Sequence, residues 1–530
     1  MIYATRRVDR SYDALVVGSG FGGGVTACRL AEAGWKVCVL ERGRRFGRDD
    51  FPERPDQAPR LLWHPKANPG GMLDLRLMRE VAVITAAGVG GGSLVYANVQ
   101  LRAPAEVFDA GWPEAIDRPT LDPWYDRTEV ALEPRTTPDE PALRKLGAFE
   151  ELARLGGRQS ERLPLAVHFG EDRDNPFGGA PQSGCQNLAR CDIGCPLHAK
   201  NTVDLTYLAR AERLGAEVYP LHEAQRIDPP GRPGGRWRVS YRGLGNGDRG
   251  TVEAPLFVLA AGVLGSTRLL LQNRKRLPGL SPALGTRFSG NGDALGGAFD
   301  PRAPGLERAE MHIGPVMTGR IDYWSDRRFM LADGALPENF SGILEIVRGA
   351  NALSGWRRNL LLRLRSLGTR MGLTDQPVTP RCIQLADRRP VTDSIVFLMI
   401  GQDAADGRME LTPLFRRMDV RWSSRASQAL FDRMHATTDE LAGVAQADPY
   451  FALGAGPFGR YITVHGLGGC PMADDPAAGV VDDTGRVHGY EGLVIADGSV
   501  VPTALGVNPA KTIAALAERS ADRLVAKGGP

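Results

Sequence analysis

The sequence has few cysteines, almost no excess of either charge and no long apolar run. Seven Cys in 530 residues are too few for the disulfide framework of a small secreted protein. Lys and Arg number 65 against 62 Asp and Glu, a net charge of +3, which gives no case for a nucleic-acid partner. No apolar run reaches the roughly 18 residues of a membrane helix, and the N-terminus has no signal-peptide core. The sequence therefore predicts a cytoplasmic protein that does not bind nucleic acid.

What the sequence does have is glycine and an ordinary globular composition. Glycine accounts for 65 residues, which indicates many tight turns and close approaches of the backbone to a ligand. The hydrophobic share of 42% and the charged share of 24% exclude a largely disordered chain. At roughly 100–200 residues per domain, this length predicts two or three domains.

A strand, a glycine-rich turn, a helix and a second strand follow one another near the N-terminus: Ala14–Val17, Gly18–Gly23, Val25–Ala33 and Lys36–Leu40. Gly18 permits the tight turn, Gly20 lets the backbone approach a pyrophosphate, and Gly23 lets the helix pack on the strand. The helix N-terminus offers free N–H groups to phosphates. Glu41 can accept hydrogen bonds from ribose hydroxyls and would repel a 2′-phosphate. The pattern predicts dinucleotide binding and disfavours NADP.

The spacing of the later segments favours FAD over NAD. After the first unit, further strands of the same kind appear only beyond residue 215, whereas a simple NAD domain would be contiguous. A second glycine patch at Gly88–Ser93 and the pair Asp497-Gly498 indicate a larger cofactor that several distant segments contact.

Five motifs carry a resemblance to a known family. They are GVGGGSLVYAN (88–98), VLAAGVLGSTRLLL (258–271), HGLGGCPM (465–472), IADGSVVP (495–502) and GVNPAKTIAALAERSADR (506–523). In this order they resemble the GMC (glucose–methanol–choline) oxidoreductases, and within them the bacterial cholesterol oxidase branch. The resemblance implies FAD, bound covalently or noncovalently, and oxidation of an alcohol to a carbonyl. It also implies an α/β, Rossmann-like FAD-binding domain that is discontinuous in sequence, and a mixed β-sheet substrate domain with helices.

The domain limits are placed where the composition changes. Segments 1–100, 185–299 and 456–530 are expected to form the FAD-binding domain, 101–184 a surface or substrate-side insertion, and 300–455 the substrate-binding domain. The expected cofactor contacts are Gly18, Gly20, Phe21, Gly23, Glu41, Arg42, Gly88, Gly90, Gly92, Ser93, Asn98, Ala224, Ala261, Gly262, Asp497, Gly498, Asn508 and Pro509.

His465 and Asn508 are the main candidates for the chemistry. Alcohol oxidation needs a hydride acceptor, a group that takes the hydroxyl proton and donors that hold the oxygen. His465 precedes a tight glycine turn, and Asn508 precedes Pro509 and the last helix. Both positions match the catalytic His and Asn of the family that the sequence resembles. We expect hydride transfer to flavin N5 at this pair.

A carboxylate is the third candidate. The segment 330–340 resembles the one that carries an acid in cholesterol oxidases, and it places Asp333 at that position. Asp333 precedes a glycine, so it could equally be a turn residue. Glu345 is the nearest rival acid. Whether His465 or Asp333 is the base stays open at this stage.

Two further features permit more than one interpretation. Cys185, Cys191 and Cys195 could be free thiols, a disulfide, or a weak candidate for a metal or iron–sulfur cluster, although their spacing is wider than that of most four-ligand sites.

Segment 348–370 is rich in Arg and Leu and lacks acids. It could contact an anionic membrane transiently, or form a solvated helix that packs on the substrate domain.

Three functions are therefore open. The first is FAD-dependent oxidation of a small-molecule alcohol, with a sterol as one candidate substrate and oxygen or an unknown group as electron acceptor. The second is the same chemistry on a sugar or natural-product hydroxyl. The third is a flavoprotein electron carrier with a cysteine relay.

Overall fold

The computed structural model describes residues 8–53, 57, 60–337, 394–452, 461–526 and 528. The rival acid Glu345 and the basic segment 348–370 lie outside the described residues. So does the run 343–347, whose alternating pattern predicts a strand. Within the described ranges, no helix combines the length and apolar character needed to cross a bilayer.

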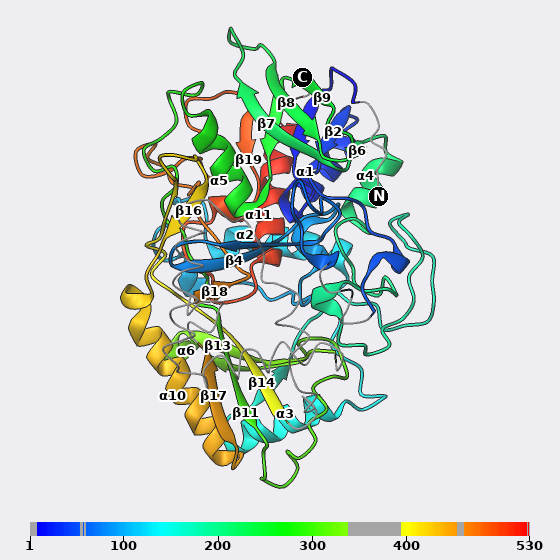
Figure 1. The fold of residues 1–530 in the computed structure, drawn as a ribbon, viewed down its shortest axis with the longest axis vertical. Coiled ribbons are helices and arrows are strands. Elements are labelled where there is room, and N and C mark those ends of the chain that lie inside the picture. Colours follow the sequence, from blue (N-terminus) through cyan, green and yellow to red (C-terminus); the bar gives the residue numbers. More distant parts are fainter. Residues whose placement is uncertain are drawn as a thin grey trace.

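A five-stranded parallel sheet forms the upper half of Figure 1. Its order is β19 (Leu493–Ile495), β10 (Leu256–Leu259), β1 (Ala14–Val17), β2 (Val37–Leu40) and β6 (Glu217–Tyr219). β1, β2 and β10 are short, wholly apolar and fully buried, as expected for parallel strands that are covered on both faces. The strands come from three distant parts of the sequence, so this domain is discontinuous.

The two faces of the parallel sheet are covered differently. Ala14 and Val16 of β1 share one hydrophobic cluster with helices α1 (Phe21–Glu32), α4 (Tyr207–Arg213) and α11 (Ala510–Ala526). Leu15 and Val17 face the other way and share a cluster with an antiparallel sheet. That sheet contains β7 (His222–Asp228), β8 (Trp237–Gly243) and β9 (Arg249–Ala254). The alternation of β1 side chains thus produces three layers.

A six-stranded antiparallel sheet forms the lower half of Figure 1. Its order is β17 (Asp448–Ala452), β11 (Ala294–Phe299), β14 (Ser394–Gly401), β13 (Phe329–Gly334), β12 (Gly319–Tyr323) and β5 (Ser160–Arg162). Helices α10 (Gln428–Val444) and α3 (Arg144–Leu155) pack against it. β5 and β11 come from the segments 101–184 and 185–299, so this sheet takes strands from outside the expected range 300–455.

Smaller elements connect the two halves. β3 (Leu73–Leu77), β4 (Val81–Ala86) and β18 (Tyr461–Thr463) form a three-stranded sheet, and β4 and β18 lie between the halves in Figure 1. Among the described residues, the other elements are a hairpin, three α-helices and several 3₁₀ turns: β15 (Arg408–Leu411), β16 (Met418–Arg421), α2 (Arg118–Leu132), α5 (Gly262–Asn273), α6 (Trp324–Arg327), and the turns Arg48–Asp50, Gly91–Leu94, Ala105–Phe108, Cys191–Ile193, Ser424–Ser427 and Gly498–Val500.

Two elements differ from what the local sequence pattern predicts. Residues 42–78 are rich in Pro, Arg and Asp, a composition that predicts a loop, but they contain β3, which pairs with β4. The alternating runs within 300–450 predict a mostly β domain, but this range contains α10. Leu430, Met434 and Leu441 of this helix are buried at helical spacing. This helical periodicity is hard to recognise in the sequence because the neighbouring segments alternate as strands do.

Candidate active site

Two glycine-rich turns cross at the N-terminus of α1. Gly18 has a φ of +100°, and a Cβ there would lie 2.1 Å from the carbonyl oxygen of Ala260. A Cβ on Gly91 would lie 2.5 Å from the Cα of Gly20. Only glycine fits these positions, so the β1–α1 turn lies directly against the patch 88–93.

The same crossing leaves space for a ligand. A Cβ on Gly20 would have no neighbour closer than 3.7 Å, and a Cβ on Gly92 would meet no atom within 4 Å. Gly20 also caps α1 without a side-chain hydrogen bond to the first turn. Free N–H groups at a helix N-terminus beside open space suit a pyrophosphate.

Glu41 follows β2 and lies buried beneath this crossing. Its Oε2 accepts hydrogen bonds from the N–H of Ser19 (3.1 Å) and from Ser19 Oγ (2.6 Å), and its Oε1 accepts one from the N–H of Gly43 (2.8 Å). The carboxylate therefore fastens the first glycine turn to the end of β2. Oε1 keeps acceptor capacity for a ribose hydroxyl.

The remaining expected cofactor contacts surround the ends of the parallel strands. Asp497 accepts hydrogen bonds from the N–H groups of Gly262 (2.9 Å) and Ser499 (2.8 Å), which ties β19 to the N-terminus of α5. Burial raises the pKa of Asp497. Phe21 and Gly23 lie in the first turns of α1, and Arg42 forms an ion pair with Asp74. The second glycine patch contains Gly88, Gly90 and Ser93. Ala224 lies on β7, Ala261 is the N-cap of α5, Gly498 follows β19 and Pro509 precedes α11.

Buried amide groups without partners indicate where a polar ligand would bind. Both side-chain polar atoms of Asn98 and of Gln100 are buried without a hydrogen-bond partner, and so is Oδ1 of Asn508. Leaving a buried polar group unpaired costs about 1–3 kcal/mol, so a bound group with donors and acceptors is expected here. The polar edge of a flavin ring fits this requirement. Gln100 is absent from the sequence-based site, although it lies two residues after Asn98.

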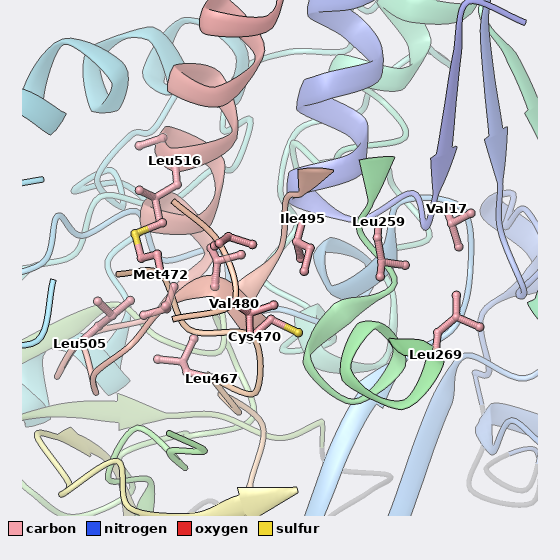
Figure 2. Close-up of a cluster of buried hydrophobic side chains, with 14 of the residues drawn as sticks. Val17, Leu259, Leu269, Leu467, Cys470, Met472, Val480, Ile495, Leu505 and Leu516 are labelled. Carbon is pink, nitrogen blue, oxygen red and sulfur yellow. The ribbon is translucent and has the colours of Figure 1, made fainter. Parts of the chain in front are cut away.

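The structure brings His465 and Asn508 together. Asn508 Nδ2 lies 3.4 Å from His465 Nε2, and Asn508 is only 6% exposed. Leu467 and Leu505, which lie close to these residues in sequence, are fully buried in one hydrophobic cluster with the ends of β1, β10 and β19 (Figure 2). That cluster anchors both site segments to the parallel sheet.

Asp293 is a second candidate site residue that the sequence reasoning missed. Its Oδ1 lies 2.7 Å from His465 Nδ1. Its Oδ2 accepts hydrogen bonds from Thr463 Oγ1 (2.8 Å) and from the N–H groups of Val464 (3.0 Å) and His465 (3.2 Å). The carboxylate thus holds both the backbone and the ring of His465. Its signal in the sequence is the run Ser289–Asp293 of small and polar residues immediately before a strand.

Asp333 is saturated by contacts of its own. It lies on β13, fully buried, and its Oδ1 accepts from the N–H groups of Thr318 (2.7 Å) and Gly319 (2.8 Å). Its Oδ2 accepts from Thr318 Oγ1 (2.5 Å) and pairs with the equally buried Lys145 at 2.8 Å. The turn interpretation is wrong, because Asp333 pairs with Phe397 inside the sheet. A carboxylate with these partners has little capacity for a substrate proton, so we infer that it stabilises the substrate domain.

Replacing Asp333 by Asn should therefore destabilise the fold. Removing one partner of a buried ion pair typically costs about 3–5 kcal/mol, and thermal unfolding of the FAD-loaded protein should show a lower midpoint. Asp139→Asn is the matched control, because Asp139 pairs with Arg162 while 84% exposed, and such pairs contribute about 0–1 kcal/mol. Wild-type stability together with lost turnover in Asp333→Asn would return this carboxylate to the catalytic site.

The three clustered cysteines Cys185, Cys191 and Cys195 are free thiols. Within the described parts of the chain, no group of three or more His, Cys, Asp or Glu side chains is placed to hold a metal ion. Burial raises the pKa of the Cys185 thiol to about 12.

Comparisons with known proteins show which family the chain is similar to. Family models described as GMC oxidoreductase match residues 12–273 and 409–517. A cholesterol oxidase of Mycobacterium tuberculosis is 32% identical over 98% of this chain and 92% of its own length. A cholesterol oxidase of Acinetobacter baumannii is 29% identical over 97% of this chain and 95% of its own. The crystal structure of pyridoxine 4-oxidase from Mesorbium loti superposes with a TM-score of 0.63 at 16% identity, covering 97% of this chain and 99% of that one.

The chain belongs to the GMC oxidoreductases. It is accordingly an FAD-dependent enzyme of the class that oxidises the CH–OH group of alcohols. The predicted family, fold class, cofactor and reaction class are confirmed.

Gly20→Val should yield a folded protein without FAD. The open space beside Gly20 is where we place the pyrophosphate, and a branched side chain would occupy it. The flavin absorbance of the purified variant measures the occupancy. Gly147→Val serves as the control, because a Cβ at Gly147 on α3 meets no atom within 4 Å, and it should keep its flavin. Full occupancy in Gly20→Val would mean that the glycine crossing is not the phosphate site.

Proposed function

We propose that this enzyme oxidises a sterol hydroxyl to a ketone at a site formed by His465 and Asn508. The convergence of His465 Nε2 and Asn508 Nδ2 at 3.4 Å carries the proposal, because the two groups can contact one substrate oxygen. The sterol assignment is supported by the two cholesterol oxidases to which nearly the whole chain is similar. FAD, when bound, supplies the acceptor for the hydride of the carbinol carbon.

The hydrogen bonds of Asp293 decide which nitrogen of His465 carries a proton. Because Asp293 Oδ2 accepts three hydrogen bonds, the side chain is held as a carboxylate acceptor. Imidazole is ordinarily a stronger base than a carboxylate, so the proton between Nδ1 and Oδ1 resides on Nδ1. Nε2 then presents a lone pair, to which the Asn508 amide can donate.

This arrangement assigns a role to each side chain. His465 Nε2 takes the proton from the substrate hydroxyl, and the resulting imidazolium is stabilised by Asp293 at 2.7 Å. Asn508 Nδ2 turns its donor to the same oxygen and holds it while the C–H bond breaks. Asp333 has no part in this step.

Anaerobic mixing tests the proposal. The FAD-loaded protein is mixed with cholesterol, 1-dodecanol or glucose, and the loss of flavin absorbance is followed. Bleaching by cholesterol at a rate far above the other two alcohols is the expected result, and bleaching by glucose alone would overturn the sterol assignment. Admission of air after bleaching then reports whether oxygen is the electron acceptor.

A further inference from the structure

The loop Ser289–Asp293 contacts both segments that carry the candidate catalytic residues. Ser289 and Leu467 exchange two backbone hydrogen bonds (3.1 and 2.9 Å), and Thr463 Oγ1 lies 3.0 Å from the carbonyl oxygen of Gly290. Together with the bonds of Asp293, these contacts fix the segment around His465. Gly290 and its neighbours therefore hold one half of the site.

Asn291 holds the other half. Its Oδ1 accepts hydrogen bonds from the N–H groups of Leu505 (2.7 Å) and Gly506 (3.0 Å). Its Nδ2 donates to the carbonyl oxygen of Val507 (2.8 Å), the residue before Asn508. Asn291 is fully buried, so removing its side chain leaves three backbone groups without their partners in the interior.

The conformation of the loop is itself fixed. Asn291 and Gly292 have consecutive positive φ values of 56° and 60°, and a Cβ on Gly292 would lie 2.4 Å from the carbonyl oxygen of Gly401. The buried Asp403 accepts from Ser289 Oγ (2.7 Å) and from the N–H groups of Gly290 (2.9 Å) and Gly292 (3.2 Å). Asn291 and Asp293 therefore project from one rigid loop toward two different segments.

We propose that Asn291 is a positioning residue for the reaction, which acts through Asn508 and, with Asp293, sets the spacing between Asn508 and His465. This inference rests on the proposed function, in which Asn508 contacts the substrate oxygen. A displacement of about 1 Å in such a contact can slow a reaction roughly 10²-fold. Removing the three hydrogen bonds of Asn291 should let the segment 505–508 move by about 1 Å.

The test is a double-mutant cycle on anaerobic flavin reduction, with whichever of cholesterol, 1-dodecanol and glucose bleaches the wild-type flavin. Asn291→Ala should lower the limiting reduction rate about 10- to 100-fold with FAD bound. In the Asn508→Ala background the same change should cost less than threefold, because the group that Asn291 positions is already missing. Asn291→Asp keeps the acceptor oxygen for the N–H groups of Leu505 and Gly506 and loses the donor to Val507, so its rate should fall between those of wild type and Asn291→Ala. It takes the place of Asn291→Ala in the cycle if that variant does not fold.

Asn273→Ala is the matched control. Asn273 is also buried, and it accepts from the N–H of Ile227 (3.0 Å) and donates to the carbonyl oxygens of Gln225 (3.2 Å) and Leu269 (2.8 Å). Like Asn291 it makes three side-chain hydrogen bonds to backbone groups, although it accepts one and donates two, and it lies at the end of α5 away from Gly262. Asn273→Ala should lower the thermal midpoint and leave the reduction rate within about twofold of wild type.

The outcomes separate the two proposals. If Asn508→Ala reduces its flavin at the wild-type rate, the proposed function fails. If Asn508→Ala is slow while Asn291→Ala is as fast as Asn273→Ala, only the positioning role is overturned. Losses from Asn291→Ala and Asn508→Ala that multiply would also overturn it, because Asn291 would then act independently of Asn508.

Discussion

Replacing Asp293 by Asn is expected to slow reduction of the bound flavin by about 10²–10⁴-fold. The amide can donate its own proton to His465 Nδ1, which would move the ring proton to Nε2 and remove the lone pair that accepts the substrate proton. FAD occupancy should not change, since the contacts of Asp293 are to the loop 463–465. Single-turnover loss of flavin absorbance measures this effect without involving the electron acceptor.

Asp482→Asn is the control for this variant. Asp482 Oδ1 accepts from the N–H of Thr484 (2.8 Å), Thr484 Oγ1 (2.7 Å) and the N–H of Arg486 (3.0 Å), a pattern similar to that of Asp293 Oδ2 but without a histidine. It should reduce its flavin at the wild-type rate. Equal rates in Asp293→Asn and Asp482→Asn would show that Asp293 does not decide which nitrogen of His465 carries the proton.

His465→Ala and Asn508→Ala should each slow flavin reduction by roughly 10² or more, with FAD still bound. Both groups are expected to act on one oxygen in one transition state, and the effects of such groups are strongly non-additive. The double variant should therefore be much less impaired than the product of the two losses. Stopped-flow reduction of the three variants and the wild type gives the four rates of the cycle.

His488→Ala controls for the loss of a partly buried imidazole. Its Nε2 lies 3.0 Å from the carbonyl oxygen of Ala473, outside the candidate site, and its removal should leave the reduction rate unchanged. Independent, multiplying losses at His465 and Asn508 would mean that they do not share a substrate atom. A wild-type rate in either single variant would remove that residue from the mechanism.

The parts of the fold that depend on neighbouring residues could be predicted from the sequence. β1 matches the expected strand Ala14–Val17 residue for residue, because a short apolar run followed by Gly18 leaves few alternatives. The two glycine patches were predicted to contact one cofactor, and their crossing at Gly20 and Gly91 is consistent with that prediction. Glycines in such positions report a steric requirement directly, whatever the distance between them in sequence.

The parts that depend on tertiary contacts could not be predicted. Asp293 lies far from His465 in sequence, and tertiary contacts such as the pairing of Ser289 with Leu467 bring their segments together. The role of Asp333 depends on its ion pair with Lys145, which lies on α3 and contacts Asp333 only in the folded substrate domain. Carboxylates of this kind look alike in a sequence, and their hydrogen-bond partners decide whether they hold a structure or assist a reaction.

The claim that His465 and Asn508 contact one substrate oxygen is tested most directly by a crystal structure. The crystal should contain the FAD-loaded enzyme and the ketone formed from the alcohol that bleaches its flavin. The account predicts that the ketone oxygen lies about 2.6–3.2 Å from both His465 Nε2 and Asn508 Nδ2, with His465 Nδ1 still on Asp293. It also predicts that Asp333 and Lys145 remain paired and do not contact the product. A ketone oxygen that contacts neither His465 nor Asn508 would contradict the account.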